Sequence, residues 1–391
     1  VYPRNSEKDN VLNNQILKGV IASIDANEVE VRFRYKQRNK KHFANNSRWA
    51  IEHDTMDSSY NSMYKSLFMF INASKRKRDL LLGVAAPTAQ VVQLNESTTY
   101  TERVVEKAMA AKDYFLIVGP PGTGKTSVFA RTLIEKYYAD KSKNILVLAY
   151  TNRAVNELCD AVNAAFGCTS GGCDKYIRVG TELSCEEPYR DRLLQNIAEK
   201  VDSRAALLKE LAETRIYIST LSSINGKQEL FNLKQFDIAI IDEASQILEP
   251  QLMGVLSKVE KFILIGDHNQ LATIVLQNEF SSEVKEQPLL DIGVYDCRVS
   301  FFERLLQTCK KNKWEDAYIQ LKDQGRMHID ISAYPSRFFY EENLSPIMSW
   351  QSEPLALMDS GQGEMDSMVA NNRVLFLSTE KDRKSTRLNS S

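Results

Sequence analysis

Residues 114–127 read YFLIVGPPGTGKTS, and this stretch decides the fold. Its first five residues are a short apolar run that predicts a buried strand, and the loop behind them has the spacing Gly-x-x-x-x-Gly-Lys-Thr. A strand, such a loop and a following helix form a P-loop, in which backbone N–H groups at a helix N-terminus surround phosphates. Lys125 would place a positive charge on the β- and γ-phosphates, and Thr126 would offer its hydroxyl to Mg²⁺. The predicted phosphate-binding residues are Gly119, Pro120, Pro121, Gly122, Thr123, Gly124, Lys125, Thr126 and Ser127.

Similar apolar runs recur along the chain, and polar or helical segments separate them. They are NILVLAY at 144–150, RIYIST at 215–220, FDIAIIDEA at 236–244 and KFILIGD at 261–267. Short, continuous runs rich in Ile, Leu and Val are typical of strands that are buried on both faces of a parallel sheet. The sequence therefore predicts an α/β fold, with a parallel sheet flanked by helices.

Two of these runs end in side chains that suit ATP hydrolysis. Asp242 and Glu243 follow one strand, where Asp242 would hold Mg²⁺ through water and Glu243 would act as the general base for the attacking water. The alternative is a solvated acidic turn. Gln270 follows the next strand, where its amide could sense the γ-phosphate or the attacking water, unless it makes only local bonds.

Composition and charge exclude several classes of protein. The chain has 391 residues with 50 Lys and Arg against 51 Asp and Glu, so it does not bind polyanions over its whole surface, although a local groove can still bind nucleic acid. It contains no run of eighteen apolar residues, which argues against a membrane span and favours a cytoplasmic location. Six cysteines in so long a chain do not form a disulfide scaffold; free thiols are favoured over a metal or cluster site. The chain starts at Val1 without a secretory signal, as if cut at its front.

The N-terminal region carries different patterns. Strand signals over residues 16–53 are followed by a helical pattern over 62–83, which has an apolar stripe at Leu67, Phe68, Phe70 and Ile71. Residues 32–42, RFRYKQRNKKH, combine basic and aromatic side chains, which favours a nucleic-acid contact or, equally, a solvated hairpin rim.

Five segments occur in the order and spacing typical of superfamily 1 helicases: GPPGTGKT, LAYTNRAVNEL, IDEASQ, GDHNQL and QGRMH…YPSRFFYEENL. The chain most resembles the B branch, which contains the nonsense-mediated-decay helicase and the flap-processing nuclease-helicase. The likeness extends from Leu94 to Leu344 and includes SFFERLLQ at 300–307. It implies RecA-like domains and ATP-driven, 5′-to-3′ movement on a single nucleic-acid strand, with DNA favoured over RNA. A nuclease domain elsewhere in the parent chain would also suit this branch.

The resemblance also implies roles for further residues. Thr151, Asn152 and Thr220 would contact the nucleic-acid strand, although each could instead be only a helix cap. Arg326 would reach the γ-phosphate from a second RecA-like domain. Thr98 stands where the branch has an adenine-reading amide, so selectivity for ATP stays open, and Gly325 replaces an aromatic residue that often precedes the arginine.

The resemblance divides the chain into four parts. We expect an accessory β-barrel and helical stalk over 1–88, and a first RecA-like domain over 89–290 with a helical insertion near 182–213. A partial second RecA-like domain over 291–383 and a non-native tail over 384–391 would follow. A chain without the family's later motifs would have little turnover on its own. The rival hypothesis is a P-loop nucleotide switch that binds ATP and a partner without translocating.

Overall fold

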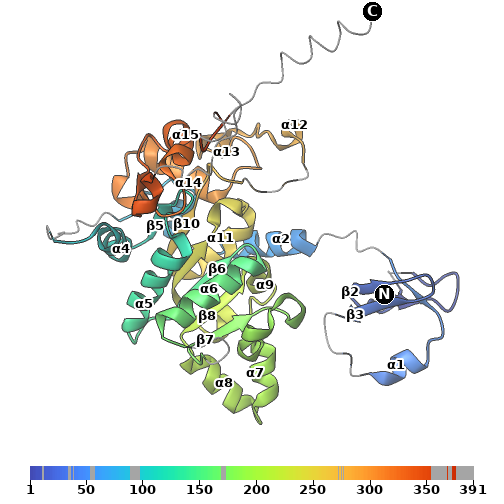
Figure 1. The fold of residues 1–391 in the computed structure, drawn as a ribbon. Helices are drawn as coiled ribbons and strands as arrows, with labels where there is room; N and C mark the ends of the chain where they lie inside the picture. The colour runs from blue at the N-terminus through green and yellow to red at the C-terminus, as the bar shows by residue number, and fades with distance from the viewer. Residues whose placement is uncertain are drawn as a thin grey trace, which may run out of the picture.

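The computed structural model describes residues 1–10, 13–33, 37, 39–52, 58–88, 97–168, 173–271, 273, 275, 277–353, 368 and 372–375. Its centre is a seven-stranded sheet with the strand order β11-β5-β10-β9-β6-β8-β7, in which all neighbours run parallel (Figure 1). The strands are β5 (Tyr114–Val118), β6 (Ile145–Ala149), β7 (Tyr176–Val179), β8 (Ile216–Thr220), β9 (Phe236–Asp242), β10 (Val259–Gly266) and β11 (Tyr318–Gln320). The predicted parallel α/β fold is confirmed.

Alternation along each strand divides the core into two layers. In β5, Leu116 packs into one hydrophobic cluster while Phe115 and Ile117 pack into another. Helices α4 (Tyr100–Ala110), α5 (Arg131–Ala139) and α6 (Asn152–Ala165) contribute to the layer of Phe115. Helices α11 (Glu249–Ser257) and α14 (Phe301–Lys311) contribute to the layer of Leu116. Both faces of the sheet are therefore covered, which explains why its strands read as continuous apolar runs.

The N-terminal strands pair outside this sheet. Strand β1 (Tyr2–Pro3) pairs with β4 (Trp49–Ala50), and β2 (Gly19–Ile24) forms an antiparallel hairpin with β3 (Val29–Phe33). The hairpin and the short helix α1 (Lys40–Ala44) lie apart from the central sheet (Figure 1). Because the described strands form two separate two-stranded sheets, the closed β-barrel stays a prediction.

The helix predicted over 62–83 is two helices, α2 (Ser58–Ile71) and α3 (Lys75–Leu81). It breaks at Ser74, whose side chain caps α3 by accepting a hydrogen bond from the Lys77 N–H. The predicted apolar stripe marks the buried face only in part, since Phe70 packs against the core whereas Phe68 and Ile71 are exposed. Helix α2 also packs on α11 through small residues: the Gly254 N–H donates to Ser66 Oγ at 2.7 Å.

The sheet does not end at the predicted boundary between residues 290 and 291. Helix α14 buries Phe301 and Leu305 in the core, and β11 pairs with β5 at the edge of the sheet. After Leu321 the chain leaves the sheet, and β12 (Asp323–Gln324) pairs with β13 (Ser345–Pro346), with α15 (Ile329–Phe339) between them in the sequence. The sequence did not reveal β11 because a three-residue strand carries no usable pattern, and the division into two RecA-like domains stays a prediction.

The remaining elements are short. Residues 182–213, where we expected an insertion, lie between β7 and β8 and hold two 3₁₀ turns (Glu182–Ser184 and Glu187–Arg192) and the helices α7 (Leu194–Lys200) and α8 (Arg204–Glu213). Elsewhere are α9 (Leu221–Asn225), α10 (Leu230–Leu233), α12 (Glu279–Ser282) and α13 (Gln287–Asp291), a π-helical turn at Lys125–Ala130, and 3₁₀ turns at Ala244–Gln246, Glu315–Ala317 and Ser349–Ser352.

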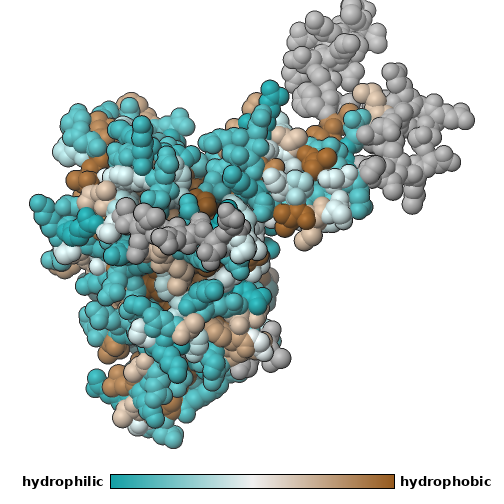
Figure 2. Space-filling model, turned by 90° about the vertical axis from the view of Figure 1, so that its left-hand side faces the viewer, coloured by the Kyte–Doolittle hydropathy of each residue, from teal (hydrophilic) through white to brown (hydrophobic). Residues whose placement is uncertain are grey.

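The face of the molecule seen in Figure 2 is mostly hydrophilic with scattered apolar side chains. Within the described ranges, no helix is both long and apolar enough to cross a bilayer.

Candidate functional site

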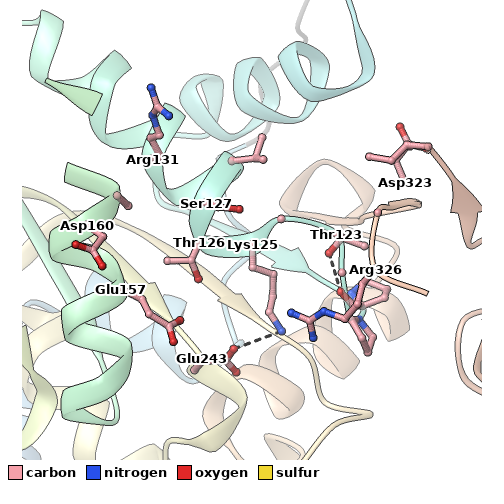
Figure 3. A pocket seen from close by; sticks show the side chains of 18 of the residues that line it. Thr123, Lys125, Thr126, Ser127, Arg131, Glu157, Asp160, Glu243, Asp323 and Arg326 are labelled. Atoms are coloured by element: carbon pink, nitrogen blue, oxygen red, sulfur yellow. Dashed lines mark hydrogen bonds and ion pairs between the residues drawn. The ribbon is translucent and has the colours of Figure 1, made fainter. Parts of the chain in front are cut away.

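A cavity of about 730 Å³ lies beside the carboxyl ends of β5, β9 and β10 (Figure 3). Crevices at this edge of an open parallel sheet are the usual ligand sites of such folds. Four residues with predicted catalytic roles line the cavity, namely Lys125, Glu243, Gln270 and Arg326. The structure thus brings together side chains from four separate segments.

The loop between β5 and the following helical turn forms one wall of the cavity. Gly122 and Gly124 have φ values of 81° and 77°, which a side chain would make costly. The Gly119 N–H donates to the Gly266 carbonyl at 2.9 Å, and the Thr123 hydroxyl donates to the Pro120 carbonyl at 2.7 Å. These bonds tie the loop to the end of β10 and fold it back on itself, leaving Lys125 at the start of the helical segment.

Asp242 lies below this loop at the end of β9. The Thr126 hydroxyl donates a hydrogen bond to its Oδ2 atom, and the carboxylate is almost fully buried. Burial is the main cause that raises the pKa of Asp242 to about 6, and the nearby Glu243 charge adds to it. A hydroxyl and a carboxylate in contact are oxygen donors suited to Mg²⁺, which usually takes one or two carboxylates besides phosphate oxygens. The predicted magnesium residues therefore fit that ion.

Glu243 has an unusual backbone conformation. Its φ is 52°, in the left-handed region that residues other than glycine rarely adopt. Its Oε1 atom lies 3.5 Å from the Lys125 Nζ atom, and its Oε2 atom accepts a bond from Gln246 Nε2 at 3.3 Å. The backbone strain and these two contacts direct the carboxylate toward the cavity, beside the lysine (Figure 3).

Gln270 and Arg326 also line the cavity. Gln270 does make a local bond, as the alternative proposed, since its Nε2 atom donates to Asp267 Oδ2 at 2.6 Å. Arg326 is held against the P-loop because the neighbouring Gly325 N–H donates to the Gly122 carbonyl at 2.9 Å. Lys125 and Arg326 both point into the cavity (Figure 3), where two cations suit a polyphosphate.

The three predicted strand-contacting residues lie at the same edge of the sheet. Thr151 and Thr220 are both helix caps: their hydroxyls accept bonds from the N–H groups of Ala154 at 3.1 Å and Ser223 at 3.2 Å. Thr220 is buried, whereas Thr151 and Asn152 are exposed. The exposed pair is therefore better placed than Thr220 to meet a ligand.

Three residues that line the cavity were not identified by the sequence analysis. Glu157, Asp160 and Arg131 also line the cavity, and only the fold brings the helices that carry them to this edge.

In the predicted basic stretch at residues 32–42, Phe33 packs against Phe43 with ring centroids 5.8 Å apart, so it is part of a small aromatic cluster. Residues 34–36 and 38 of the basic stretch lie outside the described residues, so the nucleic-acid contact and the solvated rim both stay predictions.

The cysteines do not gather into an evident metal site. Cys168 and Cys173 lie with their Sγ atoms 2.7 Å apart. In the part of the chain that the structure describes, no group of three or more His, Cys, Asp or Glu residues could hold a metal ion.

Comparison with known proteins finds helicases among the relatives of this chain. Residues 93–207 and 181–278 match a family described as an AAA domain. The human DNA replication ATP-dependent helicase/nuclease DNA2 is 31% identical over 244 residues, which are 62% of this chain and 20% of that protein. The Schizosaccharomyces pombe protein of the same description is 29% identical over 313 residues, which are 77% of this chain and 20% of that protein. The chain thus spans about a fifth of the length of these curated relatives.

Similarity to solved structures is weaker. The UvsW helicase of bacteriophage T4 aligns with a TM-score of 0.33 and 13% identity, covering 57% of this chain and 67% of that one. The fold assignment therefore rests on the strand order and the parallel pairing of the central sheet.

Proposed function

We propose that this chain contains a superfamily 1 helicase domain related to the DNA replication helicase/nucleases, and that it binds ATP and Mg²⁺ and couples hydrolysis to movement along single-stranded DNA. One observation carries the proposal: Lys125, Glu243, Gln270 and Arg326 line a single cavity at the carboxyl edge of the sheet. Each offers a different function that phosphoryl transfer to water needs.

The proposed chemistry assigns one task to each side chain. Lys125 and the P-loop N–H groups would bind the β- and γ-phosphates, and Thr126 and Asp242 would hold Mg²⁺, which spreads the charge of the phosphate oxygens. Glu243 would take a proton from the attacking water. Arg326 would stabilise the charge that develops on the γ-phosphate.

The nucleic-acid strand would cross the same edge of the sheet. Thr151 and Asn152 are exposed there and can donate to phosphate oxygens. DNA is favoured over RNA because the relatives are named for DNA replication, and 5′-to-3′ movement follows from the resemblance to the B branch. RNA translocation is the runner-up.

The wider organisation is also a proposal. We place the first RecA-like unit before about residue 321 and a second unit after it, since β11 still belongs to the central sheet. A nuclease domain in the parent chain would agree with the names of the relatives. The cytoplasmic location stays a prediction, and a role in DNA replication would favour the nucleus.

Nucleotide titration tests the binding half of this proposal. A fluorescent ATP analogue with Mg²⁺ should bind the wild-type chain and bind Lys125→Ala much more weakly. The same titration with a GTP analogue measures selectivity, which Thr98 leaves open. Equal affinity of wild type and Lys125→Ala would contradict the assignment of the P-loop.

A further inference from the structure

Asp267 joins two segments that the proposed mechanism does not connect. It follows β10 and is fully buried. Its Oδ2 atom accepts hydrogen bonds from Gln270 Nε2 at 2.6 Å and from the Tyr340 hydroxyl at 2.7 Å. Its Oδ1 atom accepts from the Asn269 N–H at 3.1 Å. The carboxylate is therefore saturated by donors from its own loop and from the residue that follows α15.

These bonds determine which way the Gln270 amide faces. A carboxylate only accepts hydrogen bonds, so the amide must direct its NH₂ group at Asp267. Its carbonyl oxygen is then the group left for the cavity that Gln270 lines. Such an oxygen can accept a hydrogen bond from a water molecule and orient it.

Tyr340 is well suited to hold the carboxylate in place. Only 2% of its surface is exposed. Burial and the hydrogen bond to Asp267 raise the pKa of its phenol, so the hydroxyl stays a donor at neutral pH. The hydrogen bond from the Tyr340 hydroxyl to the buried Asp267 carboxylate is short and charge-assisted, and such bonds are stronger than those between neutral groups.

The segment that carries Tyr340 is attached to the cavity at both of its ends. Before α15, the Gly325 N–H donates to the Gly122 carbonyl of the P-loop. After α15, Asn269 Nδ2 donates to the Phe339 carbonyl at 3.0 Å, next to the bond between Tyr340 and Asp267. Arg326 and Tyr340 thus flank one helix whose two ends touch the two loops of the cavity.

We propose that Tyr340 and Asp267 are positioning residues, which hold the Gln270 carbonyl oxygen toward the attacking water only while α15 is docked. The proposal rests on the proposed function, because it assumes ATP hydrolysis in this cavity. It makes hydrolysis depend on the second unit through two contacts, Arg326 at one end of the helix and Tyr340 at the other.

A double-mutant cycle tests the positioning role. Tyr340→Phe removes only the hydroxyl, and Tyr334→Phe is the matched control on the exposed side of α15. Single-turnover hydrolysis of MgATP is measured in the intact parent protein, present in excess over ATP, and ATP affinity is measured separately by titration. Tyr340→Phe should lower the rate constant about 10-fold or more while affinity and the Tyr334→Phe rate stay unchanged. In a Gln270→Ala background, the same change should lower the rate less than about twofold, because the oriented group is already gone.

The outcomes separate the two proposals. If Tyr340→Phe hydrolyses ATP like wild type, or loses as much in the Gln270→Ala background as alone, the positioning role is wrong. Thermal unfolding of each variant is measured as well, to check that a lower hydrolysis rate does not come from a loss of the folded structure. If wild type hydrolyses ATP no faster than Lys125→Ala, the proposed function fails, and the positioning role fails with it.

Discussion

The Lys125 ammonium lies 3.5 Å from Oε1 of Glu243, so the proposed phosphate-binding group and the proposed general base form an ion pair at the cavity. Both side chains are mostly buried, with 12% and 27% of their surfaces exposed. A polyphosphate entering the cavity would compete with Glu243 for the lysine. Phosphate binding would thereby free the carboxylate to accept a proton from water.

This pairing predicts opposite effects for two substitutions. In the intact parent protein, Lys125→Ala should weaken ATP binding and reduce hydrolysis by several orders of magnitude, since it removes the positive charge that contacts the phosphates. Glu243→Gln should bind ATP at least as tightly as wild type, because the lysine loses its competitor, while hydrolysis falls about 10²- to 10⁴-fold. Titration and single-turnover assays measure both. Glu157→Gln, the same change on another wall of the cavity, is the control and should behave like wild type.

Arg326 should act on the rate rather than on binding. We expect Arg326→Ala to lower hydrolysis about 10³-fold or more with a small change in ATP affinity, as for other arginines that stabilise the transition state. Arg326→Lys should not restore the rate, since an ammonium lacks the planar fork. Arg131→Ala is the matched control, because Arg131 lines the same cavity but pairs with Glu135 at 2.9 Å. A strong loss of ATP affinity in Arg326→Ala would contradict the assigned role.

The exposed cap of α6 should contact the nucleic-acid strand. Thr151→Ala should lower affinity for single-stranded DNA, measured by fluorescence anisotropy, and should also destabilise the fold by about 1 kcal/mol through the lost cap. Thr99→Ala removes an equivalent exposed cap from α4, so it should cost similar stability without changing DNA affinity. If the two variants bind DNA with equal affinity, Thr151 is a helix cap and does not contact the nucleic-acid strand.

A buried lysine should make stability depend on pH. Lys261 Nζ donates to the Ala108 and Met109 carbonyls at 2.7 and 2.9 Å, at the end of α4. Burial, helped by the Lys143 charge, lowers its pKa from 10.5 to about 8. Between these two values the unfolded chain holds more protons on this residue, so its contribution to the stability of the folded state grows as pH rises.

Urea unfolding at about pH 8 and about pH 9.5 measures this effect. The free energy of unfolding of wild type minus that of Lys261→Met should increase with pH, by at most about 1.4 kcal/mol per pH unit. A difference that stays constant or falls over this range would show that Lys261 keeps its ordinary pKa in the folded protein.

The sequence predicted the parts of this protein that depend on local patterns. The run YFLIV identifies a strand because every one of its residues is buried. The loop that ends in Lys125 identifies a P-loop because Gly122 and Gly124 adopt positive φ values that other residues rarely adopt. It could not reveal that Tyr340 meets Asp267, since the two are 73 residues apart and a single buried tyrosine has no period. It also left Thr151 open between a cap and a ligand contact, because one hydroxyl suits both.

Stimulation of ATP hydrolysis by single-stranded DNA tests the central claim most directly. The single-turnover rate of MgATP hydrolysis is measured in the intact parent protein with no nucleic acid, with single-stranded DNA and with single-stranded RNA, for wild type and for Lys125→Ala. We predict that DNA raises the wild-type rate more than RNA does, and that Lys125→Ala shows no hydrolysis in any condition. ATP binding with a hydrolysis rate that neither nucleic acid changes would contradict the account and favour a nucleotide switch.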